Sequence, residues 1–363
     1  MSIITFPIHM KHYIVYILLL SMLSSCHSGV KIDVQGRLVE NAASMVYLVV
    51  QNNAIDTLAS AEVAADNTFH LKTKVDFPTT AFLCDDNGNA LTVMLTEPSE
   101  LHLRPLADGG YIAEGGPIND KYNLIMMRLS DLARQVSAID AESEHAQEEY
   151  ESLSANYMQT LSTGVSDNLD NIAGVELFIS QESRSMNAED MRVRFNQFSP
   201  EMQNLPAMRK LSEYIDAYSR SEVGNQFIDF ELENITGDKI NLSDICGKGR
   251  WVLLDFWATW CAPCLETMPA LQEMYQKYAL QGFEVVGISL DRNPDRWREY
   301  ITLNKILWTN ILDKPYEDKN SASAQYGVQM IPCNFVISPD GEIVARDLTI
   351  DELRHKLEEI FGN

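Results

Sequence analysis

The sequence predicts a protein of three parts, in which an all-β domain is followed by a helical segment and a C-terminal α/β domain. Short runs rich in β-branched residues, separated by Asn, Asp, Gly and Pro, fill residues 26–117 and are typical of a β-sandwich or barrel. Residues 118–220 carry apolar side chains at helical spacing within polar sequence, which indicates a helical linker. Over residues 221–363 strand and helix patterns alternate, and this alternation predicts an α/β sheet.

The composition limits the kinds of partner that the protein has. Its 363 residues suggest about two or three domains, and 45% of them are hydrophobic, enough for a sizeable core. The chain carries 28 Lys and Arg against 52 Asp and Glu, a formal net charge of −24. Nucleic acids attract basic surfaces, so this balance argues against a nucleic-acid partner. No internal apolar run in the sequence approaches the length of a membrane-spanning helix.

Residues 1–25 predict a signal peptide of the lipoprotein type. Lys11 precedes a short apolar run that extends from Tyr13 to Leu23, as in an export signal. The quartet LSSC that ends this segment resembles the bacterial lipobox, and the resemblance implies that Cys26 becomes the first mature residue and carries lipid. The alternative is a plain secretory signal in which Cys26 is incidental. We predict a membrane-anchored lipoprotein of the cell envelope that faces the periplasm, and the sequence leaves inner or outer membrane open.

The predicted β domain consists of short alternating segments. They read VKIDVQGRLV, SMVYLVVQ, FHLKTKV, TAFLCD, ALTVMLT and ELHLRPL in chain order. The pattern resembles the small β domain found ahead of redox domains in Bacteroidetes lipoproteins. Because no cluster of His, Cys and carboxylates occurs in these segments, we interpret Cys84 as a small buried hydrophobic residue.

The helical segment is expected to be an arm that joins the two outer domains. Its first part has apolar residues at helical spacing, among them Leu129, Leu132 and Val136, and its second part is interrupted by Pro200 and Pro206. The near-heptad spacing leaves dimerisation open, but small and polar residues weaken such a seam. We therefore favour a helical spacer within one chain.

The C-terminal part is predicted element by element. The expected order is a hairpin in NITGDKINL, a buried central strand in WVLLDFW, a helix after the two cysteines, a second buried strand in FEVVGISL, a helix after Pro294, a short strand in LWTNIL, a hairpin of CNFVIS and EIVARD, and a final helix. Thr349 and Glu352 form the sequence pattern of a capping box at the start of that last helix.

Cys261 and Cys264 lie two residues apart where the central strand gives way to a helix. A structural zinc site would need two more ligands at suitable spacing, so we predict no metal, and no cofactor is called for. A static disulfide over so short a loop would constrain the unfolded chain little. At the helix N-terminus the Cys261 thiolate is stabilised, and Cys264, one turn inside, can attack a mixed disulfide formed there. The pair is therefore predicted to be redox-active.

Two stretches around the pair carry a family resemblance. DFWATWCAPC, residues 255–264, resembles the thioredoxin superfamily motif, and YGVQMIP, residues 326–332, resembles the second signature of that family, in which a cis proline faces the cysteine pair. The resemblance covers about the last 140 residues well, as one redox domain. It implies a thioredoxin-like α/β fold for the C-terminal domain.

The resemblance also implies roles for individual residues. Asp255 would be a buried carboxylate that shuttles a proton for Cys264, and burial should raise the pKa of such a carboxyl. The backbone at Ile331 and Pro332 would pair with the extended chain of a substrate protein. Trp260 would flank the pair and shape the surface that partners contact, although a structural role for this tryptophan is the alternative.

The export signal, together with an extra helix and strand between the pair and Pro332, makes the domain similar to the TlpA/ResA-like branch of membrane-tethered thiol–disulfide oxidoreductases. That similarity implies an enzyme that reduces or exchanges disulfides in envelope client proteins. It also implies a membrane electron donor of the DsbD/CcdA kind. Reduction is favoured over oxidation only by this analogy, because the Ala-Pro dipeptide between the cysteines does not fix the potential.

Two other functions remain to be weighed. The chain could be a non-catalytic envelope interaction lipoprotein with a vestigial redox domain, but the intact pair argues against this. The chain could also be a peroxide-reducing enzyme with the same thioredoxin-like fold. Peroxiredoxins resemble a pattern with a threonine three residues before the cysteine, whereas Thr259 lies two residues before Cys261.

The sequence departs from the family pattern at three places. Thr267 stands where many members of the branch carry a glutamate, and Gly287 stands where thioredoxins often have a lysine beside the buried carboxylate. Proton transfer would then depend on Asp255 and water. Cys333 directly follows Pro332. We interpret it as a small residue that starts a strand, rather than as a regulatory thiol. The sequence assigns no role to Cys246.

Overall fold

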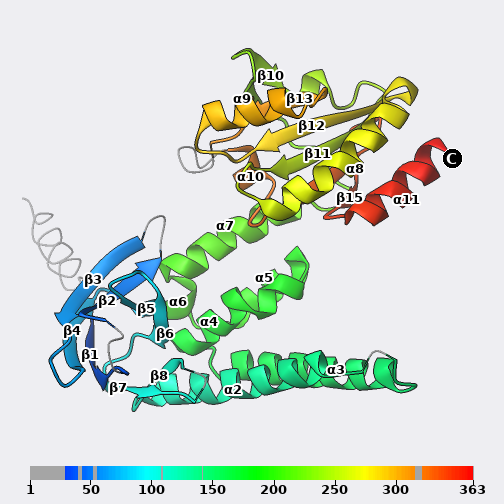
Figure 1. Cartoon of the computed structure of the whole chain (residues 1–363). Helices are drawn as coiled ribbons and strands as arrows, with labels where there is room; N and C mark the ends of the chain where they lie inside the picture. The colour runs from blue at the N-terminus through cyan, green and yellow to red at the C-terminus, as the bar shows by residue number, and fades with distance from the viewer. Residues whose placement is uncertain are drawn as a thin grey trace, which may run out of the picture. The chain divides into compact units, whose positions relative to one another are not determined.

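The computed structural model describes residues 29–39, 43–51, 55–107, 109–140, 142–314 and 321–362. The predicted signal peptide and Cys26 lie outside the described residues. The chain divides into two compact units, the first ending at Glu182 and the second beginning at Ser183 (Figure 1). This division falls within the segment predicted as a linker, so the helices of that segment are shared between the two units.

The first unit begins with an all-β domain, as the alternating pattern predicts. Its strands are β1 (Val30–Arg37), β2 (Met45–Gln51), β3 (Ile55–Glu62), β4 (Thr68–Val75), β5 (Thr80–Asp85), β6 (Ala90–Leu95), β7 (Glu100–Pro105) and β8 (Tyr111–Glu114). They form two four-stranded sheets, in the orders β4-β1-β7-β8 and β3-β2-β5-β6. Alternate residues of both sheets, such as Val34, Leu48 and Leu83, are fully buried in one shared core. The domain is therefore a sandwich of two sheets.

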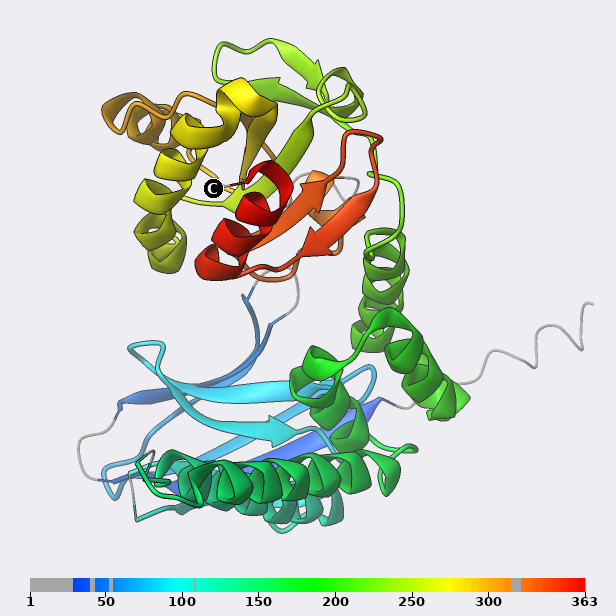
Figure 2. The same cartoon turned by 90° about the vertical axis from the view of Figure 1, so that its right-hand side faces the viewer.

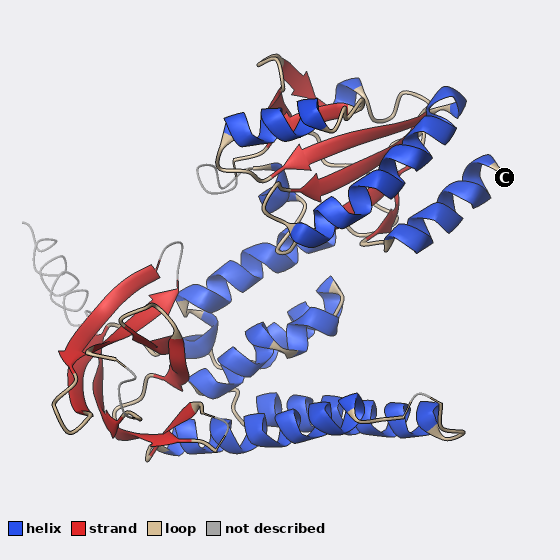
Figure 3. Ribbon diagram, in the orientation of Figure 1, coloured by secondary structure: helices blue, strands red, loops and turns tan. Residues whose placement is uncertain are grey.

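Three helices follow the sandwich in the first unit (Figure 3). They are α2 (Pro117–Ser137), α3 (Ala146–Ser166) and α4 (Ile172–Ser180). The buried carboxylate of Glu97 accepts hydrogen bonds from the amides of Ile118, at 3.2 Å, and Asn119, at 2.8 Å. These amides belong to the first turn of α2 and have no partner within the helix, so Glu97 fixes where the helix begins. Among the described residues, none of the helices is both long and apolar enough to span a bilayer.

The second unit begins with the helices α5 (Ala188–Gln197), α6 (Pro200–Gln203) and α7 (Pro206–Arg220). Pro200 and Pro206 occupy the first positions of α6 and α7, where a missing N–H costs nothing because it would lack an intrahelical partner. The prolines that interrupt the helical pattern in the sequence therefore start new helices. Met208, Leu211 and Ile215 form the buried stripe of α7.

The remainder of the second unit is a seven-stranded mixed sheet (Figure 2). Its strands are β9 (Glu231–Asn234), β10 (Lys239–Asn241), β11 (Trp251–Trp257), β12 (Phe283–Ser289), β13 (Thr309–Leu312), β14 (Cys333–Ile337) and β15 (Ile343–Arg346). The order is β10-β9-β13-β12-β11-β14-β15, with β11, β12 and β13 parallel and β14 antiparallel to β11. The predicted α/β fold class is confirmed, and β11 is an interior strand of the sheet, as its largely apolar sequence indicated.

Helices cover both faces of this sheet. They are α8 (Ala262–Tyr278), α9 (Pro294–Leu303), α10 (Ala322–Gln325) and α11 (Ile350–Phe361). The ring of Trp257 lies 5.4 Å from that of Tyr300 in α9, whereas the preceding residue, Phe256, has its ring 5.9 Å from that of Tyr326 after α10. Neighbouring strand residues point to opposite faces, so α9 and Tyr326 lie on opposite faces of the sheet.

The C-terminal end of helix α7 contacts the Phe256 side of the sheet. The Arg346 guanidinium lies 4.0 Å from the ring centre of Tyr218 in α7 and 4.8 Å from that of Phe335 in β14. Its Nη1 also donates to Ser221 Oγ at 3.2 Å. The end of helix α7 is thus tied to the sheet through Arg346, although its sequence was assigned to the linker. At the other end of the domain, Thr349 and Glu352 form the predicted capping box of α11.

Candidate active site

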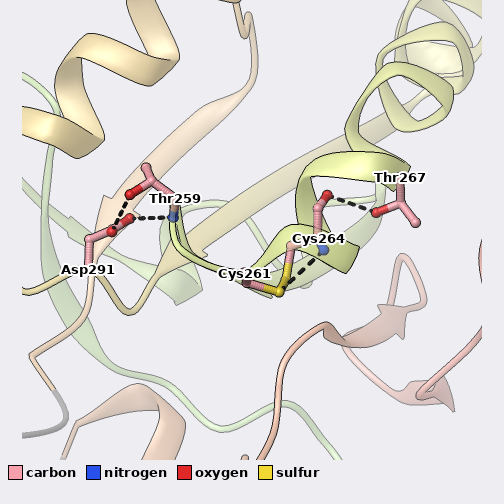
Figure 4. Close-up of a disulfide and its surroundings, with 5 residues drawn as sticks. All are labelled: Thr259, Cys261, Cys264, Thr267 and Asp291. Carbon is pink, nitrogen blue, oxygen red and sulfur yellow. Dashed lines mark hydrogen bonds between the residues drawn. A yellow bond between two sulfur atoms is a disulfide. The ribbon is translucent and has the colours of Figure 1, made fainter. Parts of the chain in front are cut away.

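The predicted cysteine pair is a disulfide at the start of α8. The Sγ atoms of Cys261 and Cys264 are bonded, and the two Cα atoms are 5.3 Å apart. Cys261 is the N-cap residue of α8, and its Sγ accepts a hydrogen bond of 3.2 Å from the Cys264 amide (Figure 4). An anion at this position faces free amides and the positive end of the helix dipole. The geometry therefore favours a thiolate on Cys261 once the disulfide opens.

Both cysteines of the pair are buried. Cys261 is 5% exposed and Cys264 is 2% exposed. The neighbouring Trp260 is 54% exposed, whereas Trp257, three residues earlier on β11, is only 1% exposed. The two tryptophans of the motif therefore differ in environment, with Trp257 in the core and Trp260 on the surface.

Asp255 lies on β11, on the same face of the sheet as Trp257 and hence on the α9 side. Its cross-strand neighbours in the register are Gly287 on β12 and Asn334 on β14. Asp255 is partly exposed as a whole residue, but its carboxyl is buried. This burial raises the pKa of the carboxyl from 3.8 to about 7. A carboxyl with that pKa can both take up and release a proton near neutral pH.

The structure explains the glycine beside Asp255. A Cβ on Gly287 would lie 2.7 Å from Asn310 Oδ1 and 3.1 Å from the indole nitrogens of both Trp257 and Trp308. The room that a lysine side chain would need at this position is filled by the two indoles and the amide. Asp255 therefore has no cationic neighbour at position 287, and desolvation alone accounts for its raised pKa.

The second motif lies at the same edge of the sheet. Cys333, the first residue of β14, pairs with Phe256 near the end of β11, so the residues just before it lie beside the turn that leads to Cys261. The Ile331–Pro332 peptide bond is cis, as the family resemblance implies. Ile331 is half-buried and Pro332 is exposed, while Met330 before them is 71% exposed.

The other described cysteines are free thiols, and Cys84 is only partly buried, unlike the buried residue that the sequence predicted. Cys333 is buried on the Phe256 face, opposite to Asp255, and burial raises the pKa of its thiol well above the usual value. Burial also raises the pKa of Cys246 to about 12, and it raises that of Cys84 as well. These thiols stay protonated near neutral pH and are poor nucleophiles. Among the described residues, no three His, Cys, Asp or Glu side chains gather as a metal site would require.

One pair of contacting residues was missed in the sequence. Thr259, in the turn before Cys261, donates its backbone amide and its hydroxyl to the buried carboxylate of Asp291, at 2.9 and 2.6 Å (Figure 4). The Thr259 hydroxyl is thus committed to Asp291. Thr267, at the family's glutamate position, donates its hydroxyl to the carbonyl of Cys264 at 3.0 Å. An acid two residues after the largely buried strand β12 was a signal in the sequence for the role of Asp291.

Known proteins are similar to the C-terminal part of this chain. The model of the AhpC/TSA family matches residues 223–346. The thiol–disulfide oxidoreductase ResA of Bacillus cereus is 30% identical over 146 residues, which are 40% of this chain and 80% of that protein. The protein of the same name from Oceanobacillus iheyensis is 34% identical over 145 residues, or 38% of this chain and 72% of that protein.

Solved structures also match this region. The thioredoxin domain of a thiol–disulfide oxidoreductase from Bacteroides vulgatus is 28% identical, with 39% of this chain and 98% of that chain covered and a TM-score of 0.36. Because the ResA proteins are matched over most of their own length, the chain belongs to the ResA/TlpA-like family of thiol–disulfide oxidoreductases, with a thioredoxin-like enzyme domain at its C-terminus.

Proposed function

We propose that the protein is an exported, lipid-anchored thiol–disulfide oxidoreductase that reduces disulfides in client proteins of the cell envelope. The observation that carries this proposal is the Cys261–Cys264 pair at the N-terminus of α8, with the carboxyl of Asp255 on the neighbouring strand. A reactive thiol at a helix tip, a second thiol within one turn and a proton acceptor that titrates near neutral pH are the groups that thiol–disulfide exchange needs.

The reaction starts from the dithiol form. The Cys261 thiolate attacks one sulfur of the client disulfide, the other client sulfur leaves as a thiol after taking a proton, and a mixed disulfide forms. Cys264 then gives its proton to the Asp255 carboxylate and attacks Cys261 Sγ. The second client sulfur leaves and takes a proton in turn. Two electrons pass to the client, which becomes a dithiol, while the pair becomes the disulfide.

Two features beside the pair would hold the client. Trp260 offers an apolar surface beside Cys261, and the backbone at Ile331 and Pro332 would pair with an extended client segment by β-augmentation. Each turnover leaves the pair oxidised, so a dithiol donor in the membrane, of the DsbD/CcdA kind, would have to restore the reduced form. Lipid on Cys26 would hold the protein at the membrane that carries this donor.

A redox titration tests the central claim. The purified protein is equilibrated in glutathione buffers of increasing reducing power, free thiols are alkylated, and the mass of the peptide with Cys261 and Cys264 is measured. We expect this peptide to convert reversibly between disulfide and dithiol. A pair that stays in one form across the whole series would instead support the alternative of a vestigial redox domain.

The anchor is tested separately in cells. Growth with labelled palmitate should label the wild-type protein, and Cys26→Ser should abolish the label and release the protein from the membrane fraction. Label that persists in Cys26→Ser would exclude Cys26 as the lipidated residue. This result is independent of the redox chemistry.

Trp260→Ala should weaken client binding without loss of stability. Trp260 is 54% exposed, so its removal creates no cavity, and we expect the melting temperature to stay within a few degrees while KM for a disulfide client rises about threefold to tenfold. Trp257→Ala is the matched comparison, because Trp257 is 1% exposed and its truncation should cost about 3–5 kcal/mol of stability. An unchanged KM in Trp260→Ala would contradict the proposed contact surface.

A further inference from the structure

Two buried acidic residues follow neighbouring strands at the edge of the sheet that carries the redox site. Asp291 follows β12 and is 5% exposed, and Asp313 follows β13 and is 0% exposed. The two strand ends are paired in register at Ser289 and Leu312. The Asp313 amide also donates to the Ser289 carbonyl at 2.9 Å. The two acids are therefore held by the same rigid pair of parallel strands.

Asp291 binds the turn that precedes the cysteine pair. Its Oδ2 accepts from the Thr259 amide at 2.9 Å, and its Oδ1 accepts from the Thr259 hydroxyl at 2.6 Å. The Ser289 hydroxyl donates to Asp291 Oδ2 at 2.8 Å and steadies the carboxylate from its own strand. The turn continues directly to Cys261, whose amide donates to the Ala258 carbonyl at 3.1 Å.

Asp313 binds the segment that precedes the cis proline. Its Oδ2 accepts from the amide and the hydroxyl of Ser323, at 2.9 and 2.6 Å, and its Oδ1 accepts from the Ala322 amide at 3.1 Å. The Ser323 carbonyl in turn accepts from the Val328 amide at 2.8 Å. Val328 is three residues before Ile331, so this chain of hydrogen bonds leads from β13 to the loop that ends at Pro332.

The hydrogen bonds that the two carboxylates accept from the two segments do not overlap. Asp291 contacts only the turn before the cysteines among these two segments, and Asp313 contacts only the segment before the loop, within the part of the chain that the structure describes. A buried carboxylate that accepts several short hydrogen bonds holds its donors closely, because each lost bond would leave a desolvated polar group without a partner.

We propose that Asp291 and Asp313 are positioning residues that hold the two halves of the redox site independently. Asp291, through Thr259, fixes the nucleophile Cys261 at the tip of α8. Asp313, through Ser323, fixes the backbone that receives the client chain. The assignment of the second half to client binding rests on the proposed function. Neither acid contacts the reacting sulfurs, so the effect of each is exerted through geometry.

The test compares three substitutions in the full chain, none of which changes the charge. Thr259→Val removes the hydroxyl bonded to Asp291, Thr259→Ser keeps it, and Ser323→Ala removes the hydroxyl bonded to Asp313. Two quantities are measured on each reduced protein at one pH. One is the rate at which iodoacetamide alkylates Cys261, which involves no client, and the other is KM for a disulfide client.

The expected pattern is a separation of the two quantities. Thr259→Val should slow alkylation by about threefold to tenfold and leave KM within about twofold, and Thr259→Ser should restore the wild-type rate. Ser323→Ala should do the reverse, with KM raised by about threefold to tenfold and alkylation unchanged.

Two results would overturn the proposal. In the first, Thr259→Val and Thr259→Ser are alkylated at equal rates and differ only in that the valine variant has a lower melting temperature. This result would indicate that the contact between Thr259 and Asp291 is purely structural. The other is a Ser323→Ala variant that changes alkylation as much as KM, which would mean that the halves are not held separately. Failure of the proposed function is recognised differently, because the redox titration of the wild-type protein would then show no interconversion whatever the alkylation rates.

Discussion

Cys261→Ser should abolish reduction of a client disulfide, with the rate reduced by several orders of magnitude, as the loss of a nucleophile generally does. Cys261 caps α8, where free amides and the helix dipole stabilise a thiolate. A serine hydroxyl at this position remains protonated near neutral pH and cannot attack a disulfide. The measurement is the reduction of insulin by dithiothreitol, which the wild-type protein should accelerate and the variant should not.

Cys264→Ser should fail in a different way. The attack by Cys261 remains intact, but no thiol is left one helical turn away to resolve the mixed disulfide. Turnover should therefore stop while a covalent complex between Cys261 and the client accumulates, and mass spectrometry under non-reducing conditions identifies it. The same trap, applied in cells, would identify the natural clients.

The matched controls are Cys246→Ser and Cys333→Ser. Both residues are buried and both thiols have raised pKa values, so their replacement should leave insulin reduction within about twofold, once any change in folded fraction is corrected. Insulin reduction by Cys261→Ser at the wild-type rate would contradict the assignment of the nucleophile. A trapped complex in Cys261→Ser instead of Cys264→Ser would reverse the two roles.

Asp255→Asn should stabilise the oxidised protein at alkaline pH. The unfolded chain releases the Asp255 proton near the ordinary pKa of 3.8, whereas the folded protein keeps it up to about 7. Between these values the folded state binds more protons than the unfolded state, so stability falls as the pH rises from about 4 to about 7. Asp255→Asn does not lose stability in this way. At pH 8 its free energy of unfolding should exceed that of the wild type by an amount on the order of a few kcal/mol.

The same substitution should slow catalysis, since asparagine cannot accept the proton of Cys264. We expect the resolving step to slow by about 10²-fold or more and to lose its pH dependence near 7. Urea unfolding at pH 4, 6 and 8 gives the stability, and stopped-flow reduction of a disulfide client gives the rate. Asp340→Asn, in an exposed turn, is the matched control that should change neither. A variant of Asp255 with wild-type stability at pH 8 would show that the carboxyl is not desolvated.

Local patterns in the sequence were sufficient for most of the fold. The largely apolar WVLLDFW predicted a buried central strand, and the structure has the interior strand β11 over Trp251–Trp257. The capping pattern of Thr349 and Glu352 likewise marks the start of α11. Helix α7 was assigned to the linker because an amphipathic stripe shows that one side is buried but does not identify what buries it. Arg346, which contacts Tyr218 at the end of this helix, lies more than 100 residues further along the chain.

In the candidate site, too, the sequence was sufficient only for residues that lie close together along the chain. Cys261, Cys264 and Asp255 could be found from their spacing and from a family resemblance, because the motif is contiguous. The contacts of Gly287 with Asn310 and Trp308 could not, since they depend on the register of three strands. The bond between Asp291 and Thr259 likewise joins residues that are 32 positions apart and carries no local signature.

The place of α7 has a practical consequence for anyone who wishes to produce the redox domain alone. A fragment that starts at Ser221, where the sequence pattern would place the domain boundary, lacks Tyr218. The guanidinium of Arg346 then loses the aromatic ring that it contacts in α7. A fragment that starts at Ser183, where the second compact unit begins, keeps Tyr218 over Arg346 and is the better choice for crystallisation or spectroscopy.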